Sequence, residues 1–308
     1  MKRYAINRLQ EWKEDPYRLP MIIRGARQVG KTWLMQEFGR TAFEQCAYIN
    51  FDRNERMQNL FSGDFDVDRI LRGLAIESGV EIDPENTLII LDEIQEVPAA
   101  LQSLKYFCED NRHSYYILAA GSLLGIAMHE GTSFPVGKVD IKTMYPMDME
   151  EFLLAVGEND LVERIKQCFA EDSPMPAALH EAAMQRYRQY LVVGGMPECV
   201  MQFAETKDYI LVRHTQDTIL ASYLNDIGKY NTPNKIKKIM LVYDSITVQL
   251  SRKNTRFQYK LIKRGGRASE FENAIEWLCL SGIVSQVYKV EQIKKPLENY
   301  RDIDAFKI

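Results

Sequence analysis

The 308 residues are 46% apolar and 27% charged, with a net charge of −4, which is typical of a globular chain of about two domains. Five widely spaced cysteines without a C-x-x-C pair, and four isolated histidines, exclude a disulfide framework and a zinc site as organising features. The longest uncharged stretch, Tyr115 to Met128, is too short to span a bilayer, and the N-terminus lacks an apolar signal core. We therefore expect a cytoplasmic protein with no membrane partner.

Short apolar runs in the first half of the chain predict five β-strands. A helix with Ile6, Leu9 and Trp12 on one face precedes them, and helical or polar segments separate them. Short apolar runs bounded by turn residues are typical of strands that are buried on both faces of a parallel sheet. The alternation therefore predicts an α/β fold with a parallel sheet covered on both faces. The expected strands are 20–23, 47–51, 87–93, 115–120 and 137–144.

The segment between the first strand and the next helix has the pattern G-x-x-x-x-G-K-T. In a strand–loop–helix context this pattern predicts a phosphate-binding P-loop, because its glycines let main-chain N–H groups approach a polyphosphate closely. Lys31 would reach the β- and γ-phosphates, and the Thr32 hydroxyl would ligate Mg²⁺. We therefore predict that ATP and Mg²⁺ are bound here. The expected nucleotide-binding residues of the loop are Gly25, Ala26, Arg27, Gln28, Val29, Gly30, Lys31, Thr32 and Trp33.

Polar residues follow the third and fourth expected strands, where an α/β sheet places its site. Asp92 would hold the Mg²⁺, directly or through water, and Glu93 would polarise the attacking water. The alternative for this pair is a helix-capping function. Ser122, after the fourth strand, would sense the γ-phosphate, with a plain helix cap as the alternative. We predict Lys31, Glu93 and Ser122 as the catalytic residues, and Thr32 and Asp92 as the metal ligands.

Beyond these motifs, the chain resembles a widespread prokaryotic family of AAA+-type P-loop ATPases along essentially its whole length. The resemblance implies an additional strand between the P-loop strand and the Asp92 strand, a catalytic glutamate, a winged helix and a C-terminal domain related to restriction endonucleases. Most of that last domain would be absent, and we expect no nuclease activity. Family members usually carry arginine at Lys138, so no arginine-finger role is assigned there. The strings that carry the resemblance include GARQVGKT, LIILDEIQ, AAGSLL, SFPVGKVDIKTMYPMDMEEFL and YLVVGGMPECV.

The second half of the chain begins with a predicted helical lid. Helices are expected at 149–156, 161–169, 177–192 and 208–227, with a helix stop and restart at Gly194 to Pro197. The resemblance implies that Pro197 contacts the adenine. The predicted domains are an ATPase core (1–146), the lid (147–228), a winged helix (229–292) and the start of a truncated C-terminal domain (293–308).

Helical spacing of apolar residues from Ile236 to Leu250, and a capping box of Ser269 with Glu272, predict the two helices of the winged helix. Gly282 would end the second helix, and 283–290 would form a wing strand. The exposed face of that helix would carry Glu270, Asn273 and Glu276, which is the wrong charge for reading bases in a duplex.

The segment from Lys229 to Arg267 is strongly basic. It contains eleven Lys or Arg residues and one acid, Asp244, so it carries +10 and the remainder of the chain carries −14. We predict contacts to DNA or RNA phosphates without sequence preference. A solvated face, or docking onto an acidic protein surface, is the alternative.

The predicted function is Mg²⁺-dependent ATP hydrolysis that drives or times a conformational change. GTP is disfavoured, because Asn234 to Lys237 ends in lysine where an N-K-x-D motif needs aspartate. The alternative is a nucleotide-gated protein-binding switch with slow turnover, acting on a protein partner or in a homo-oligomer.

Overall fold

The computed structural model describes residues 2–110, 114–122, 124, 134–252 and 256–308. The chain divides into two compact units, Met1–Ile219 and Leu220–Ile308. None of the described helices is long and apolar enough to cross a membrane. Lys253, within the predicted basic segment, and Ser133, in one string of the family resemblance, lie outside the described residues.

The first unit contains a five-stranded parallel sheet with the strand order β2-β3-β4-β1-β5. The predicted α/β fold is confirmed, and β4 lies between β1 and β3 as the family resemblance implies. The fifth strand is shorter than the predicted 137–144, because Gly137 adopts a φ of +71° in a turn ahead of it. The strands are β1 (Met21–Arg24), β2 (Gln45–Asn50), β3 (Thr87–Asp92), β4 (Tyr116–Gly121) and β5 (Asp140–Thr143).

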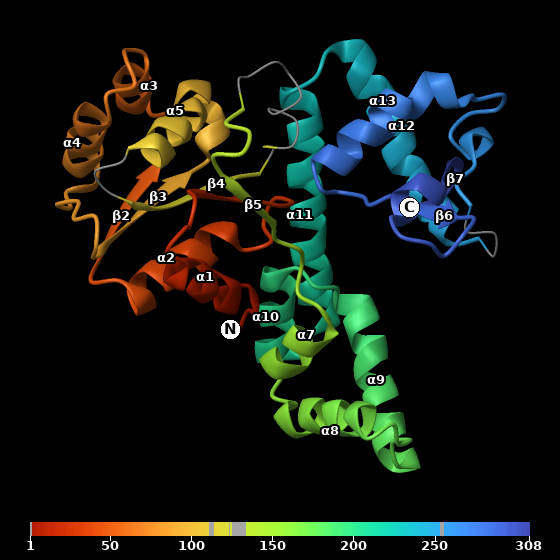
Figure 1. Cartoon of the computed structure of the whole chain (residues 1–308). Helices are drawn as coiled ribbons and strands as arrows, with labels where there is room; N and C mark the ends of the chain where they lie inside the picture. The colour runs from red at the N-terminus through yellow and green to blue at the C-terminus, as the bar shows by residue number, and fades with distance from the viewer. Residues whose placement is uncertain (1, 111–113, 123, 125–133, 253–255) are drawn as a thin grey trace. The chain divides into compact units, whose positions relative to one another are not determined.

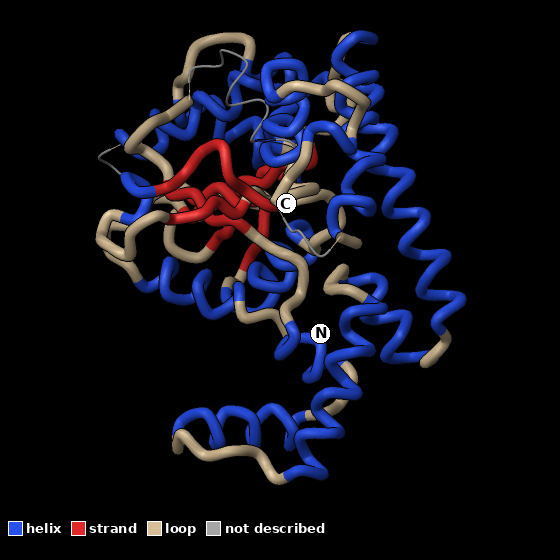
Figure 2. The backbone as a smooth tube through the Cα atoms, turned by 90° about the vertical axis from the view of Figure 1, so that its right-hand side faces the viewer, coloured by secondary structure: helices blue, strands red, loops and turns tan. Residues whose placement is uncertain are grey.

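Helices cover both faces of this sheet, as Figure 1 and the strands inside the helical layers of Figure 2 show. On one face lies α2, with α1 packed against it, and on the other lie α3, α4 and α5. Every residue of β3 is buried, which explains why its sequence is a continuous apolar run. These helices are α1 (Ala5–Glu14), α2 (Lys31–Ala42), α3 (Glu55–Phe61), α4 (Val67–Ser78) and α5 (Pro98–Glu109).

Five helices follow the sheet. Leu153, Leu161 and Val162 form a small core between the first two, and Phe152 stacks on Phe203 with ring centroids 6.1 Å apart. The sequence predicts that a helix restarts after Gly194 and Gly195, and the structure has a separate helix there with Pro197 in its first turn. The five are α7 (Met149–Ala155), α8 (Asn159–Ala170), α9 (Ala177–Val193), α10 (Pro197–Thr206) and α11 (Tyr209–Lys229).

In the second unit, two packed helices precede a two-stranded antiparallel sheet. The predicted capping box is wrong. The second helix begins at Ala268 with Arg267 at its N-cap, and no side chain caps it. The Glu270 N–H bonds to the Arg267 carbonyl and closes the first turn, which places Ser269 inside the helix, where its hydroxyl cannot act as a cap. The elements are α12 (Pro233–Leu250), η2 (Tyr259–Leu261), α13 (Ala268–Leu280), β6 (Val287–Val290), η3 (Leu297–Tyr300) and β7 (Arg301–Lys307).

The last strand, β7, was not expected from the sequence. It pairs with β6, and the Phe306 carbonyl accepts a 2.8 Å hydrogen bond from the Phe257 N–H. The Phe306 ring is buried and stacks on Phe257, with centroids 5.2 Å apart. These contacts join residues 301–307 to the compact unit Leu220–Ile308. The predicted boundary at residue 293 stays a prediction.

Candidate functional site

The loop between β1 and α2 has the backbone geometry that its glycines allow. Gly30, the N-cap of α2, has a φ of +93°, where a side chain is disfavoured. Gly25 is required for space as well, because a Cβ there would lie 2.2 Å from the Met144 carbonyl oxygen. Gln28 adopts a φ of +65° without being glycine. The loop therefore wraps tightly around the N-terminus of α2, an arrangement suited to anions.

Lys31 lies at the centre of this loop and is 5% exposed. Its ammonium donates to the carbonyl oxygens of Gly25 and Ala26, both at 2.9 Å, and lies 3.4 Å from Ser122 Oγ. Burial lowers the pKa of Lys31 to about 8, while Glu93 and other carboxylate charge nearby oppose the shift. The lysine is thus held by carbonyls of its own loop, beside the space that a phosphate would enter.

Asp92 accepts two hydrogen bonds on one carboxylate oxygen. The Thr32 hydroxyl donates at 2.7 Å and the Tyr48 hydroxyl at 3.0 Å, both to Oδ2. Burial raises the pKa of Asp92, and the hydrogen bond from Thr32 opposes this shift. Burial, then the Asp92 charge, raises the pKa of Tyr48 to about 12. Sequence reasoning missed Tyr48, since only the register of β2 on β3 brings it to this carboxylate.

Glu93 has both carboxylate oxygens occupied within the protein. Ser122 Oγ donates to Oε1 at 3.2 Å, and Gln95 Nε2 donates to Oε2 at 2.6 Å. The Glu93 backbone is left-handed, with a φ of +53°, which is uncommon outside glycine and turns the chain directly after β3 into a 3₁₀ turn. The structure therefore brings together Lys31, Glu93 and Ser122, as the sequence predicts. Gln95, part of the quoted string LIILDEIQ, was not singled out.

Lys31, Glu93 and Ser122 border one cavity of about 560 Å³, within the range that small-molecule sites occupy. Pro197, at the start of α10, reaches it, and a Cβ on Gly30 would lie 3.6 Å from Pro197 Cγ. Gly25, Ala26, Val29 and Asp92 are not among the described residues that line it. Arg3, Glu198 and Met201 line it without having been predicted. The predicted residues on its wall are Arg27, Gln28, Gly30, Lys31, Thr32, Trp33, Glu93, Ser122 and Pro197.

The oxygen donors of Thr32 and Asp92 suit Mg²⁺ better than a transition metal. Among the described residues there is no group of three or more His, Cys, Asp or Glu side chains that could hold a metal ion. Magnesium is usually bound through one or two protein oxygens together with phosphates and water. The Asp92 carboxylate and the Thr32 hydroxyl, 2.7 Å apart, provide such oxygens beside the cavity.

Lys138 takes no part in this cavity as the structure describes it. Its ammonium pairs with Glu109 at 3.0 Å, and both side chains are exposed. The hydrogen bond to Glu109 raises the pKa of Lys138. Exposed pairs of this kind contribute little to stability, and the lining residues of the cavity do not include Lys138.

A parallel sheet with β4 between β1 and β3, a glycine-bounded loop at the N-terminus of α2, and a carboxylate at the end of β3 define a P-loop nucleotide-binding domain. Residues 17–153 match the family model described as "AAA domain", and they form a P-loop domain of the AAA+ type. A second model, described as "Domain of unknown function (DUF8612)", matches residues 184–308. That match begins inside α9 and covers the whole second unit.

Solved structures resemble the chain only loosely. The Aeropyrum pernix ORC1 protein in complex with DNA is 14% identical, with a TM-score of 0.35 over 98% of this chain and 87% of that one. Drosophila ORC bound to DNA is 11% identical, with a TM-score of 0.34 over 98% and 90%. AMPPCP-bound DnaA from Aquifex aeolicus is 14% identical, with a TM-score of 0.36 over 91% of each chain. Superpositions this loose carry no functional argument, and no curated protein matches the chain.

Proposed function

We propose that this protein binds ATP with Mg²⁺ and hydrolyses it to drive or time a conformational change. One observation carries the proposal: the Lys31 ammonium, the Thr32–Asp92 pair and the Glu93–Ser122 pair converge beside one cavity. A charged donor, a metal-binding pair of oxygens and a carboxylate base are the parts that phosphoryl transfer to water needs.

Each part has a chemical role in this mechanism. N–H groups of the loop and of the start of α2 bind the phosphates, and Lys31 moves from its own carbonyls to the β- and γ-phosphates. Thr32 and Asp92 would hold Mg²⁺, whose charge would offset that of the phosphate oxygens. Glu93 accepts a hydrogen bond from the attacking water and orients it. Ser122 would hold Glu93 in place and sense the γ-phosphate.

The base of the nucleotide would lie where α10 approaches the loop. Trp33, Pro197 and Met201 give this part of the cavity an apolar wall, and two of them, Trp33 and Met201, are 41% and 49% exposed. A planar purine would cover such surface and gain from its removal from water. We expect adenine here, with Pro197 in contact with the ring.

Two variants test this function. Lys31→Ala should abolish nucleotide binding, since it removes the ammonium that the loop carbonyls of Gly25 and Ala26 hold beside the cavity. Glu93→Gln should bind ATP but lose turnover, because an amide cannot accept the proton of the water. Lys105→Ala, an exposed change on α5, is the control. Equal turnover by wild type and Glu93→Gln would contradict the assignment.

One observation favours the second candidate, a nucleotide-gated switch whose ATP-bound state is the output. Both oxygens of Glu93 accept hydrogen bonds from protein groups, and these donors hold the carboxylate in one orientation although its oxygens keep lone pairs for a water. This would keep turnover slow until a partner, either another protein or a second copy, displaces a donor. Gln95→Ala discriminates: it should accelerate turnover if this contact restrains Glu93, and leave turnover unchanged if it does not.

For the second unit, two helices followed by an antiparallel pair of strands support a winged-helix interpretation, with β6 and β7 as the wing. Nucleic acid is the partner that its charge suggests. Exposed cations lie on α12 and on the following segment, whereas α13 exposes acidic residues. We therefore expect binding through phosphates without sequence preference. The exposed cations on this surface include Lys237, Lys238, Arg252, Lys260, Lys263, Arg264 and Arg267.

A further inference from the structure

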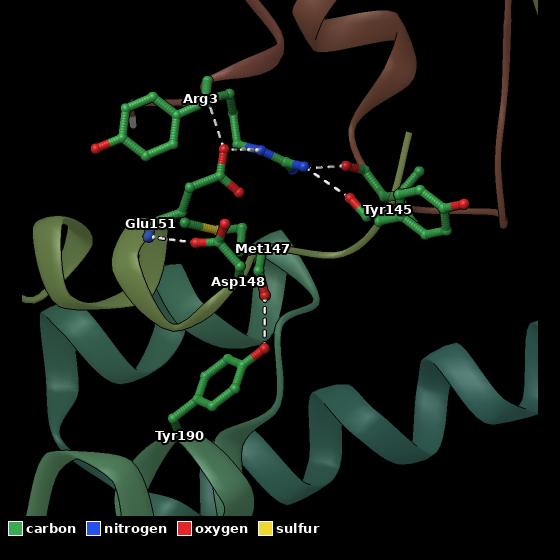
Figure 3. A network of polar contacts seen from close by, with 8 residues as sticks. Arg3, Tyr145, Met147, Asp148, Glu151 and Tyr190 are labelled. Atoms are coloured by element: carbon green, nitrogen blue, oxygen red, sulfur yellow. Dashed lines mark hydrogen bonds and ion pairs between the residues drawn. The ribbon is translucent and has the colours of Figure 1, made fainter. Parts of the chain in front are cut away.

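Arg3 places a buried guanidinium beside the candidate nucleotide site. The residue is 5% exposed and makes three contacts with distant segments of the first unit (Figure 3). Nη1 donates to the Val29 carbonyl at 2.9 Å, Nη2 donates to the Tyr145 carbonyl at 2.7 Å, and Nε pairs with Glu151 Oε1 at 3.2 Å. One side chain thus joins the P-loop, the segment after β5 and helix α7.

Further hydrogen bonds hold Glu151, the residue of α7 that Arg3 contacts. Glu151 Oε1 also accepts the Tyr4 N–H at 2.7 Å, and Glu151 is 6% exposed. Nearby, the Met147 N–H donates to the Gly195 carbonyl, and the Met147 carbonyl accepts the Tyr190 hydroxyl at 2.9 Å. A Cβ on Gly195 would lie 2.1 Å from that same Met147 oxygen. The contacts therefore run from the P-loop to the backbone that leads into α10.

The contact with Val29 determines the direction of the next N–H group. A trans peptide is planar, so its C=O and N–H point in opposite directions. Because Arg3 holds the Val29 carbonyl, the Gly30 N–H is directed to the other side of the Val29–Gly30 peptide. Gly30 is the N-cap of α2 and lines the cavity, and the N–H groups at such a helix start bind anions.

We propose that Arg3 is a positioning residue of the nucleotide site, which orients the Val29–Gly30 peptide toward phosphate and ties it to α7 through Glu151. The inference rests on the proposed function. An ion pair buried this deeply is weak support for stability, because loss of hydration offsets much of the attraction. The geometric role follows from the guanidinium itself, since its fork of five N–H donors serves three acceptors at once, whereas a lysine ammonium cannot match that planar arrangement.

The test compares binding of a fluorescent ATP analogue and of inorganic tripolyphosphate, a competitor without a base, in the full chain. Arg3→Lys keeps the charge but loses the fork. It should weaken the binding of both probes about tenfold, equivalent to about 1.4 kcal/mol. Arg8→Lys, the same exchange at an exposed position of α1, should bind like wild type. Thermal unfolding without nucleotide verifies that each variant is folded at the assay temperature.

Three outcomes would overturn the inference, and a fourth would contradict the proposed function. If Arg3→Lys lowers the Tm but binds tripolyphosphate like wild type, Arg3 is only a structural anchor and the inference fails. It also fails if only the ATP analogue is weakened, because the effect then lies at the base. Should Arg3→Lys not fold, Glu151→Ala removes the acceptor that holds Arg3 Nε and the Tyr4 N–H, and unchanged binding of both probes by this variant overturns the proposal. A wild type that binds neither probe contradicts the proposed function itself.

Discussion

The Thr32 hydroxyl donates a 2.7 Å hydrogen bond to Asp92 across sixty residues of sequence. The two lie at the start of α2 and the end of β3, and β4 separates the strands that lead to them. Their oxygens are therefore presented from two rigid elements rather than from mobile loops. The hydroxyl keeps its lone pairs while it donates its O–H, and the carboxylate has further lone pairs, so both oxygens can bind a metal while this hydrogen bond persists.

Asp92→Asn should remove most of the gain in ATP affinity that Mg²⁺ provides. An amide oxygen carries no charge and is a weaker ligand for Mg²⁺ than a carboxylate, so we expect the Mg²⁺-dependent gain to fall at least about tenfold. The measurement is ATP affinity with and without Mg²⁺. Asp52→Asn, at an exposed carboxylate two residues after β2, is the matched control. An identical response to Mg²⁺ in Asp92→Asn and wild type would exclude Asp92 as a ligand.

Nucleotide binding should take up protons at alkaline pH. Burial lowers the pKa of Lys31 to about 8, and a bound polyphosphate raises it again because the anion favours the ammonium. We expect uptake of about half a proton per ATP at pH 8 and about a tenth at pH 7. Calorimetry in two buffers of different ionisation enthalpy measures this number. Lys31→Arg, whose guanidinium stays charged, should show no uptake if it still binds.

The Lys31 ammonium also makes the stability of the folded protein depend on pH. The folded pKa of about 8 lies below the ordinary value of 10.5, so the unfolded state binds more protons between these two values. The contribution of Lys31 to stability therefore rises with pH across this window and is least favourable below pH 8. A contribution that instead falls from pH 8 to 10, measured as the difference between wild type and Lys31→Met, would contradict the buried, desolvated lysine.

Removing the Phe306 ring should destabilise the second unit. Phe306 is 6% exposed and stacks on Phe257, and truncation of a buried phenylalanine costs about 3 kcal/mol or more. Ile303, on the same strand, is 64% exposed, so Ile303→Ala should change stability by less than about 0.5 kcal/mol. Amide hydrogen exchange of α13, measured in the full chain, compares the Phe306→Ala and Ile303→Ala variants. Equal protection in both variants would show that β7 does not stabilise the unit.

The basic segment should bind duplex DNA with a strong salt dependence. If four to six cations contact phosphates, log affinity should fall with log salt at a slope of roughly −4 to −5. Replacing Arg252, Lys260, Lys263 and Arg264 with alanine should weaken binding and flatten the slope, while Glu272→Gln on α13 leaves the slope unchanged. A salt-insensitive affinity would instead indicate that the basic segment docks on protein. The remainder of the chain carries −14 and is one acidic partner for such docking.

Predictions from the sequence succeeded where the signal is local. The glycine spacing of the P-loop and the apolar runs of the strands depend on the residues themselves, because backbone freedom and burial on two faces restrict which residues can stand there. The capping box at Ser269 is local too, but it is wrong: the N-cap is Arg267, two residues earlier, and the helix begins at Ala268 after a turn in which Gly265 has a φ of +77°. A helix boundary depends on the turn that precedes the helix, and a motif of four residues does not include that turn.

The sequence alone determined that a strand, a phosphate-binding loop and a helix stand in series with a carboxylate strand downstream. Only the tertiary structure decided which side chains complete the site. Tyr48 reaches Asp92 through the register of β2 on β3, and Arg3 reaches Val29 because α1 packs on α2. The reason is physical: a single tyrosine or arginine has no periodicity or spacing that marks it. Its partner is fixed by packing between elements, where a buried polar group must find a hydrogen bond.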